Sequence, residues 1–237
     1  MLRQLKMAHN NLSTPLENLM RKRRSCRAFL PEQLPQELIE RILDTSQRTA
    51  SWCNTQPWQL TITRNEGTDR LRKALYEAAF LGGAQTNGSS DIAFPDVYEG
   101  IYLERRRDAA IQLFNAMGIE KNNKAERESN ALRNFELFGA PHLVIVSAPS
   151  TLGTYGAMDC SAWVSNFMLV ALSHGVASIA QASLARYSDL LHRHLSIDQD
   201  NKIICGISFG FADTAHPANN FSTTRAKIST FVKWVNN

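Results

Sequence analysis

Three arginines and a serine lie within five residues of the chain, at Arg23, Arg24, Ser25 and Arg27. Guanidinium groups form paired hydrogen bonds with phosphate oxygens, and each charge-assisted bond contributes about 1.5–3 kcal/mol. We call residues 23–27 the arginine segment. Its residue types predict an anion-binding site. A solvated basic surface run is the common alternative, and the rest of the sequence must decide between the two.

A second stretch, Ser51–Trp58, is rich in side chains that form hydrogen bonds. We call it the 51–58 loop, because it falls between a predicted helix and a predicted strand. Alone it would be interpreted as a well-capped turn. Only one predicted helix separates it from the arginine segment, and this proximity favours a shared site.

Other motifs in the chain carry weaker evidence of chemistry. Gly206–Gly210 matches the G-x-S-x-G pattern of serine hydrolases, with Ser208 as the nucleophile. That motif needs a helix after it, but residues 211–220 look like a loop, so a strand ending in small residues is the better interpretation. His192 and His194 are two residues apart on a predicted helix and point to different faces, so no metal site is expected.

Two common nucleotide-binding patterns are missing from the sequence. No glycine-rich dinucleotide fingerprint follows a predicted strand, and no G-x-x-x-x-G-K phosphate loop occurs. A redox cofactor would therefore have to be held by side chains such as those of the arginine segment.

Composition limits the class of protein. The chain has 237 residues, of which 43% are hydrophobic and 20% are charged, as expected of a globular domain. No apolar stretch approaches the roughly 18 residues of a membrane span, and residues 1–11 lack a signal-peptide core. Four widely spaced cysteines favour reduced thiols and a cytoplasmic location. A net charge of +4 suits a small anionic ligand and is too diffuse to indicate nucleic acid.

Hydrophobic periodicity predicts alternating helices and strands. We expect helices from Thr14, from Pro35, over 68–79, over 102–138, over 157–174 and over 188–195. We expect strands over 58–63, 143–147, 176–180 and 203–209, with a loop over 82–100. The 157–174 helix is apolar on nearly all sides, so covering it would require a second copy of the chain.

Two motifs in this order, R-R-S-x-R-x-F at 23–29 and S-x-x-N-T-Q-P-W at 51–58, resemble the FMN-dependent nitroreductase family. F-G-A-P at 138–141 and G-F-A-D at 210–213 extend the resemblance, which covers about Met20 to the C-terminus. Nitrobenzoate and nitroaromatic reductases look most similar. The resemblance implies an α+β fold with a mostly antiparallel central sheet flanked by helices. It also implies one domain over 1–237 and an interlocked homodimer with two FMN sites at its interface.

The resemblance also implies roles for individual residues. The side chains that would hold FMN are Arg23, Arg24, Ser25, Arg27, Ser51, Trp52, Asn54, Gln181 and Arg225. Arg23 and Arg225 would meet the phosphate, Arg27 would lie near the pyrimidine N1/O2 edge, and the 51–58 loop would reach the flavin of the other protomer. Residues 180–182 would lie beside N5, where a backbone N–H is the expected donor. Small residues are usual in relatives at the position of Trp52, which would stack near the flavin or narrow the pocket.

The implied activity is hydride transfer from NAD(P)H through flavin N5 to a nitroaromatic or quinone-like acceptor, with ping-pong kinetics. No catalytic side chain is implied. The acceptor would lie under a lid formed by residues 85–135, and the candidate contacts are Cys53, Phe94, Tyr98 and Tyr102. Core packing is the expected role for at least two of the lid aromatics. The partners would be a second copy and a small aromatic acceptor, with no nucleic acid and no membrane.

Two alternatives stay open. A flavin-dependent reductive dehalogenase would use a Glu/Tyr/Lys set in the lid, for which Tyr98, Glu99, Tyr102 and Lys121 are present at unpersuasive spacing. A non-turnover protein that stores or senses FMN is the other.

Overall fold

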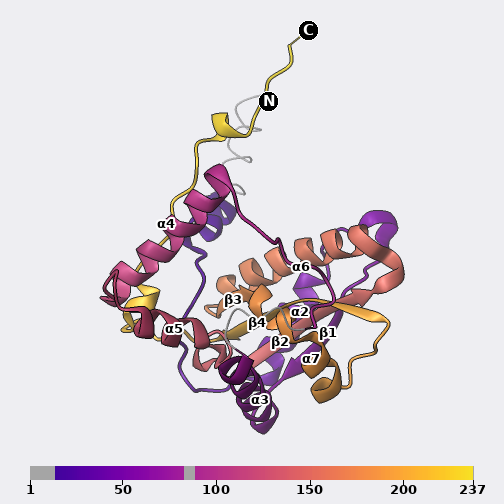
Figure 1. The fold of residues 1–237 in the computed structure, drawn as a ribbon. Helices are drawn as coiled ribbons and strands as arrows, with labels where there is room; N and C mark the ends of the chain where they lie inside the picture. The colour runs from indigo at the N-terminus through magenta and orange to yellow at the C-terminus, as the bar shows by residue number, and fades with distance from the viewer. Residues whose placement is uncertain (1–13, 83–88, 237) are drawn as a thin grey trace.

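The computed structural model describes residues 14–82 and 89–236, and Figure 1 shows a central sheet with helices on both faces. Its strands are β1 (Gln59–Thr63), β2 (His142–Pro149), β3 (Ala177–Gln181) and β4 (Asn201–Gly210). Their order is β1-β2-β4-β3, and every neighbouring pair is antiparallel. The predicted strands and the antiparallel α+β class are therefore confirmed, with strand ends shifted by one to a few residues.

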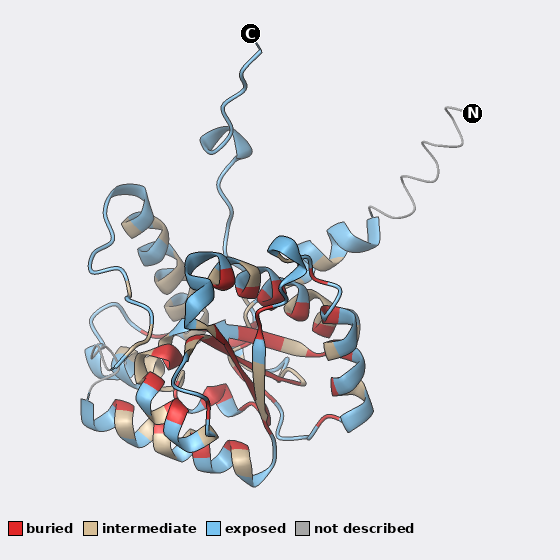
Figure 2. Ribbon diagram, turned by 90° about the vertical axis from the view of Figure 1, so that its right-hand side faces the viewer, coloured by how far each residue is buried: buried red, intermediate tan, exposed pale blue. Residues whose placement is uncertain are grey.

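Side chains alternate between two cores because successive strand residues point to opposite faces. On one face α2 (Gln36–Ser46) and α6 (Gly153–Ser173) cover Val144, Val146 and Phe209. On the other, α3 (Glu66–Gly82) and α7 (Ser188–Leu195) cover Leu143 and Ile145. Figure 2 shows the buried strands between these helical layers.

Helix α6 is covered on one side only. Trp163 and Phe167 are fully buried against the sheet, as the apolar sequence predicts. On the outward face lie residues spaced three and four apart along the helix, and these are Tyr155, Met158, Ala162, Ser165 and Leu169. This outward stripe is the part of α6 that a single chain leaves uncovered.

The 102–138 segment is largely helical, as predicted, and it contains two helices, α4 (Gly100–Met117) and α5 (Lys124–Leu132). Helix α4 ends at Gly118, which has φ 70°, a conformation that glycine adopts without strain. Asn123 then starts α5 by accepting a hydrogen bond from the Glu126 N–H. Of the predicted loop over 82–100, residues 83–88 lie outside the described residues, and 89–99 contain no helix or strand.

Short 3₁₀ helices join these elements: η1 (Trp52–Asn54), η2 (Leu137–Gly139), η3 (Ser150–Leu152), η4 (Ala182–Tyr187), η5 (Pro217–Asn219) and η6 (Ile228–Thr230). After η5, residues 221–236, here called the C-terminal segment, run beside α4 and then leave the body of the protein (Figure 1). Phe231 and Trp234 are 66% and 79% exposed there. No helix in the described ranges is long and apolar enough to cross a membrane.

Candidate functional site

Backbone hydrogen bonds to β3 and η2 fix the arginine segment and the residues just after it. The Cys26 N–H donates to the Ser178 carbonyl at 3.1 Å, and Ser25 forms an isolated parallel bridge with Ser178. Two residues beyond the segment, the Phe29 N–H donates to the Phe138 carbonyl at 3.3 Å. The arginine side chains therefore leave from a backbone that the sheet holds in place.

Asn219 is a buried brace for the segment. Its Oδ1 accepts from the Arg27 N–H at 2.7 Å, and its Nδ2 donates to the carbonyls of Ala28 at 2.9 Å and Asp213 at 2.8 Å. Arg133 Nη2 adds a bond to the Arg27 carbonyl at 3.1 Å. Side chains from two distant segments thus hold both backbone polar groups of Arg27. Sequence reasoning missed both residues.

A cavity of about 340 Å³ lies between the arginine segment and the C-terminal segment. Its basic lining residues include Arg23, Arg24, Arg27 and Arg225, and Ser25 lies among them. Burial lowers the pKa of Arg23, and the neighbouring charge of Arg225 lowers it further. Burial also lowers the pKa of Arg27. None of these arginines forms an ion pair within the described part of the chain.

An anion would stabilise the half-buried Arg23, whose charge is opposed by that of the exposed Arg225, and the half-buried Arg27. The surface-run alternative does not fit Arg23 and Arg27, which are half-buried, although Arg24 is exposed. An adjoining cavity of about 430 Å³ has the arginine segment on one side and an apolar wall on the other. That wall contains Met168, Leu172 and Val176. A ligand with both a phosphate group and a flat apolar ring would match these two surfaces.

The 51–58 loop has an unusual backbone. Cys53, Asn54 and Gln56 have φ of 51°, 56° and 46°, in the left-handed region that residues other than glycine rarely adopt. Ser51 Oγ accepts from the Gln56 N–H at 2.9 Å and closes the turn. Cys53 and Asn54 are exposed.

The N-terminal part of helix α6 holds the 51–58 loop in place. The Trp52 N–H donates to the Asp159 carboxylate, with 3.1 Å to Oδ2, and the Trp52 ring lies 4.4 Å from that of Tyr155. Trp52 is nevertheless 59% exposed. Within one chain its ring therefore packs on Tyr155, on the face of α6 that carries the outward stripe.

The structure does not bring the 51–58 loop and the arginine segment together within one chain. The loop contacts α6 at Tyr155 and Asp159, whereas the cavity of the arginine segment contacts it at Met168 and Leu172. About 13 residues separate Asp159 from Leu172, which is roughly 20 Å along a helix. Neither cavity at the arginine segment is lined by a residue of the loop.

The Gln181 side chain forms its hydrogen bonds inside the protein. Ser208 Oγ donates to Gln181 Oε1 at 2.5 Å, and Gln181 Nε2 donates to the Asn134 carbonyl at 2.8 Å. Gln181 is only 3% exposed, so a contact with a ligand here would have to come from the backbone of the segment. Ser208 is fully buried within β4, which confirms the interpretation of G-x-S-x-G as part of a strand.

The predicted acceptor residues lie apart from the arginine segment. Phe94 packs against the core, with the Arg186 guanidinium 4.2 Å from its ring. Tyr98 lies beside Arg106 at 4.9 Å and is 41% exposed, and Tyr102 is exposed on α4. None of them lines either cavity at the arginine segment.

The cysteines differ in exposure. Burial raises the pKa of the Cys160 and Cys205 thiols to about 12, and burial also raises the pKa of Cys26, so these three are poor nucleophiles. Only Cys53 is exposed, and no disulfide joins the four. Within the described ranges, no group of three or more His, Cys, Asp and Glu side chains could hold a metal ion.

Comparison with known proteins identifies relatives along nearly the whole chain. The family model described as "Nitroreductase family" matches residues 20–211. Nitroreductase NfnB of Mycolicibacterium smegmatis is 30% identical over 220 residues, which cover 92% of each chain. The 4-nitrobenzoate reductase of Pseudomonas putida is 30% identical over 226 residues, covering 94% of this chain and 97% of the relative.

Solved structures agree with these relatives. The FMN-dependent nitroreductase NfnB of Mycobacterium smegmatis, in complex with NADPH, superposes with a TM-score of 0.88 at 29% identity, covering 95% of this chain and all of that one. The FMN and NADPH-dependent nitroreductase NfnB of sphigopyxis sp. strain HMH gives 0.87 at 26% identity, covering 94% and 99%. The chain belongs to the nitroreductase family and has its fold.

Proposed function

We propose that the protein is an FMN-dependent NAD(P)H:acceptor oxidoreductase that reduces nitroaromatic or quinone-like compounds. The observation that carries this proposal is the set of half-buried arginines without ionic partners in the described residues, beside an apolar wall. Its family relatives include the FMN and NADPH-dependent reductases described above.

The residues present fit FMN. Arg23 and Arg225 lie close enough for one charge to perturb the other, which suits a shared phosphate dianion. Ser25 and Arg24 line the same cavity and would add polar contacts. Arg27, held by Asn219, would face the ring and favour negative charge developing on it. Bound FMN would supply the chemistry, taking a hydride from NAD(P)H and delivering it to an acceptor in the same pocket.

A homodimer would complete the site. If two α6 helices packed antiparallel through their outward stripes, the Tyr155 end of one would lie beside the Leu172 end of the other. Ser51, Trp52 and Asn54 of the 51–58 loop would then reach the cavity of the partner's arginine segment. The exposed stripe and the exposed apolar residues of the C-terminal segment support this assembly, because such surfaces usually mark interfaces.

The remaining assignments belong to the same proposal. Residues 1–237 would form one domain with 85–135 as a lid, and the acceptor would contact Cys53, Phe94, Tyr98 and Tyr102. The free cysteines support a cytoplasmic location. The dehalogenase and FMN-storage alternatives are not favoured, because the named relatives are nitroreductases.

The test is a spectrum of the purified protein followed by anaerobic titration with NADPH and NADH. We expect a flavin absorbance band that NAD(P)H bleaches and that 4-nitrobenzoate restores. A protein without the band would contradict FMN binding. A flavin that neither dinucleotide bleaches would support a storage protein.

A further inference from the structure

His216 is bonded to both of the segments that hold Arg27 in place. Its Nδ1 accepts a hydrogen bond from the Ala218 N–H at 3.1 Å and so caps η5, the turn that carries Asn219. Its Nε2 lies 3.4 Å from Nη1 of Arg133. Asn219 accepts from the Arg27 N–H, and Arg133 donates to the Arg27 carbonyl. One half-buried imidazole ring therefore contacts the supports of both backbone polar groups of Arg27.

The bond from Ala218 indicates the protonation state of this ring. A ring nitrogen that accepts an N–H bond carries no proton, so His216 is neutral, with its single proton on Nε2. A second proton would go to Nδ1 and remove the acceptor, and the N–H of the fully buried Ala218 would lose its partner. The added positive charge would also repel the Arg133 guanidinium. Protonation of His216 would therefore disturb the cap of η5 and the position of Arg133 together.

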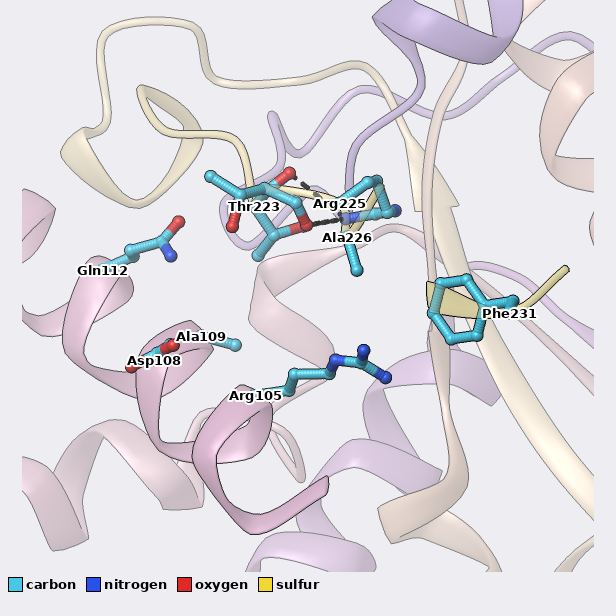
Figure 3. A pocket seen from close by; sticks show the side chains of 9 residues that line it. Arg105, Asp108, Ala109, Gln112, Thr223, Arg225, Ala226 and Phe231 are labelled. Carbon is cyan, nitrogen blue, oxygen red and sulfur yellow. Dashed lines mark hydrogen bonds between the residues drawn. The ribbon is translucent and has the colours of Figure 1, made fainter. Parts of the chain in front are cut away.

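The groups around His216 decide when it takes up this proton. Burial and the positive charge of Arg133 lower the pKa of His216 from its ordinary value of 6.5, and the negative charge of Asp213 in the same loop opposes them. Helix α4 also packs against η5, but its Arg105 and Asp108 line a separate cavity beside the C-terminal segment, which His216 does not line (Figure 3). The ring is therefore mainly neutral at neutral pH and takes up its second proton below pH 6.5.

We propose that His216 is a positioning residue for Arg27 and that its protonation weakens FMN binding in acid. Neutral His216 keeps Asn219 and Arg133 where they bond to Arg27, and protonated His216 releases both. The inference rests on the proposed function, because it assigns a pH dependence to the cofactor site. FMN affinity should be full above about pH 6.5 and should fall as the pH falls through the lowered pKa of His216, because the unprotonated form binds FMN best.

The first experiment measures FMN dissociation constants by fluorescence titration of the full-length, FMN-free chain from about pH 8 to about pH 5.5. His216→Asn keeps an acceptor for the Ala218 N–H and does not titrate, whereas His216→Ala has no acceptor. His194→Asn is the matched control, because it changes an exposed histidine of α7 that lines neither cavity at the arginine segment. The FMN phosphate itself titrates at about pH 6 and affects every variant alike, so the comparison isolates His216.

The Asn variant should restore binding and remove the pH dependence that His216 adds. At about pH 7.5 we expect His216→Asn to bind FMN within about threefold of wild type, and His216→Ala to bind it about tenfold more weakly. On acidification to about pH 5.5, wild type should lose at least about threefold more affinity than His216→Asn. Parallel pH profiles for these two proteins would overturn the proposal, and so would wild-type affinity in His216→Ala. Because the Asn variant carries the pH test, the test does not depend on how well His216→Ala folds.

The second experiment needs no cofactor. Two-dimensional N–H spectra of the full-length chain, isotope-labelled at arginine, follow the Arg27 resonance while the pH is lowered. We expect this resonance to shift with the titration of the His216 ring in wild type and in His194→Asn, and to stay in place in His216→Asn. A wild-type Arg27 resonance that does not move would overturn the proposal. A wild-type protein that binds no FMN at any pH would instead contradict the proposed function, and the Arg27 spectra would still decide whether His216 positions Arg27.

Discussion

The arginine segment and the 51–58 loop lie at opposite ends of α6 and differ in how their backbones are held. The arginine segment is tied to β3 and to Asn219, and its Arg23 and Arg27 side chains are half-buried. Residues 52–56 of the loop are exposed, and three of them have positive φ. The loop meets the body at Trp58, which is buried in the core, and through the bond from the Trp52 N–H to the Asp159 carboxylate.

This difference indicates a division of labour. Side chains that bind a charged ligand need fixed positions, and the arginine segment has them within its own chain. Positive φ in residues other than glycine costs of order 1–3 kcal/mol and persists where surrounding structure requires it. The 51–58 loop holds such a conformation at the surface, where a partner subunit could use it. Single substitutions in the arginine segment, on α6 and in the 51–58 loop test this difference.

The largest effect should come from Asn219→Ala. The variant removes three buried or partly buried hydrogen bonds, each worth about 1 kcal/mol, and leaves the Arg27 N–H and the Ala28 carbonyl without that partner. We expect the free energy of unfolding to fall by about 3 kcal/mol in urea titration and FMN to be lost on purification. The neighbouring, exposed Asn220→Ala should change stability by less than about 0.5 kcal/mol. Equal midpoints for the two variants would show that Asn219 does not brace the segment.

The next largest effect should come from Met158→Asp, on the outward stripe of α6. Met158 is 59% exposed in the single chain, so a carboxylate there costs little in a monomer and much in a packed interface. We expect light scattering to show a shift toward monomer, accompanied by weaker FMN binding. Lys73→Asp, an exposed change on α3 across the sheet, serves as the control. A Met158→Asp protein that stays dimeric would contradict the proposed use of this stripe.

Arg27→Ala should affect the ligand more than the fold. Losing one charge-assisted bond of about 1.5–3 kcal/mol would weaken FMN binding roughly 10-fold to 150-fold. It should also lower the flavin reduction potential, because a positive charge near the ring favours the reduced form. Fluorescence titration and potentiometry against a reference dye measure the two effects. Arg48→Ala, an exposed arginine after α2, is the control. An unchanged potential would place Arg27 away from the ring.

The sequence predicted regular elements better than the contacts that position the site. Residues 188–195 form a helix with both predicted ends, because the apolar stripe and its boundaries are local. The 102–138 segment is helical as predicted, but the break inside it was not predicted, because Gly118 and Asn123, which end one helix and begin the next, are weak breaks in a polar stretch. The three closely spaced arginines of the sequence indicated an anion site, and the structure does place Arg23, Arg27 and Arg225 around one cavity.

Other features had no local pattern from which to predict them. Asn219 braces Arg27 from 192 residues away, and an asparagine two residues after a proline looks like ordinary loop sequence. Arg133, just after the end of α5, contacts the Arg27 carbonyl from 106 residues away. The left-handed backbone at Cys53 and Asn54 could not be predicted, because neither residue is a glycine. Such features depend on tertiary packing, which a single sequence does not display.

The smallest expected effect concerns the strain of the 51–58 loop. Glycine usually destabilises by about 0.5–1 kcal/mol through the entropy of the unfolded chain, but at positive φ it also relieves about 1 kcal/mol of steric cost. Cys53→Gly, at φ 51°, should therefore leave the unfolding free energy within about 0.5 kcal/mol of wild type. Thr55→Gly, an exposed residue of the same loop at φ −70°, should lose the full amount. If both variants lost the same free energy of unfolding in chemical denaturation, Cys53 would not have a left-handed backbone in solution. The 51–58 loop would then differ from the arginine segment only in its exposure to solvent.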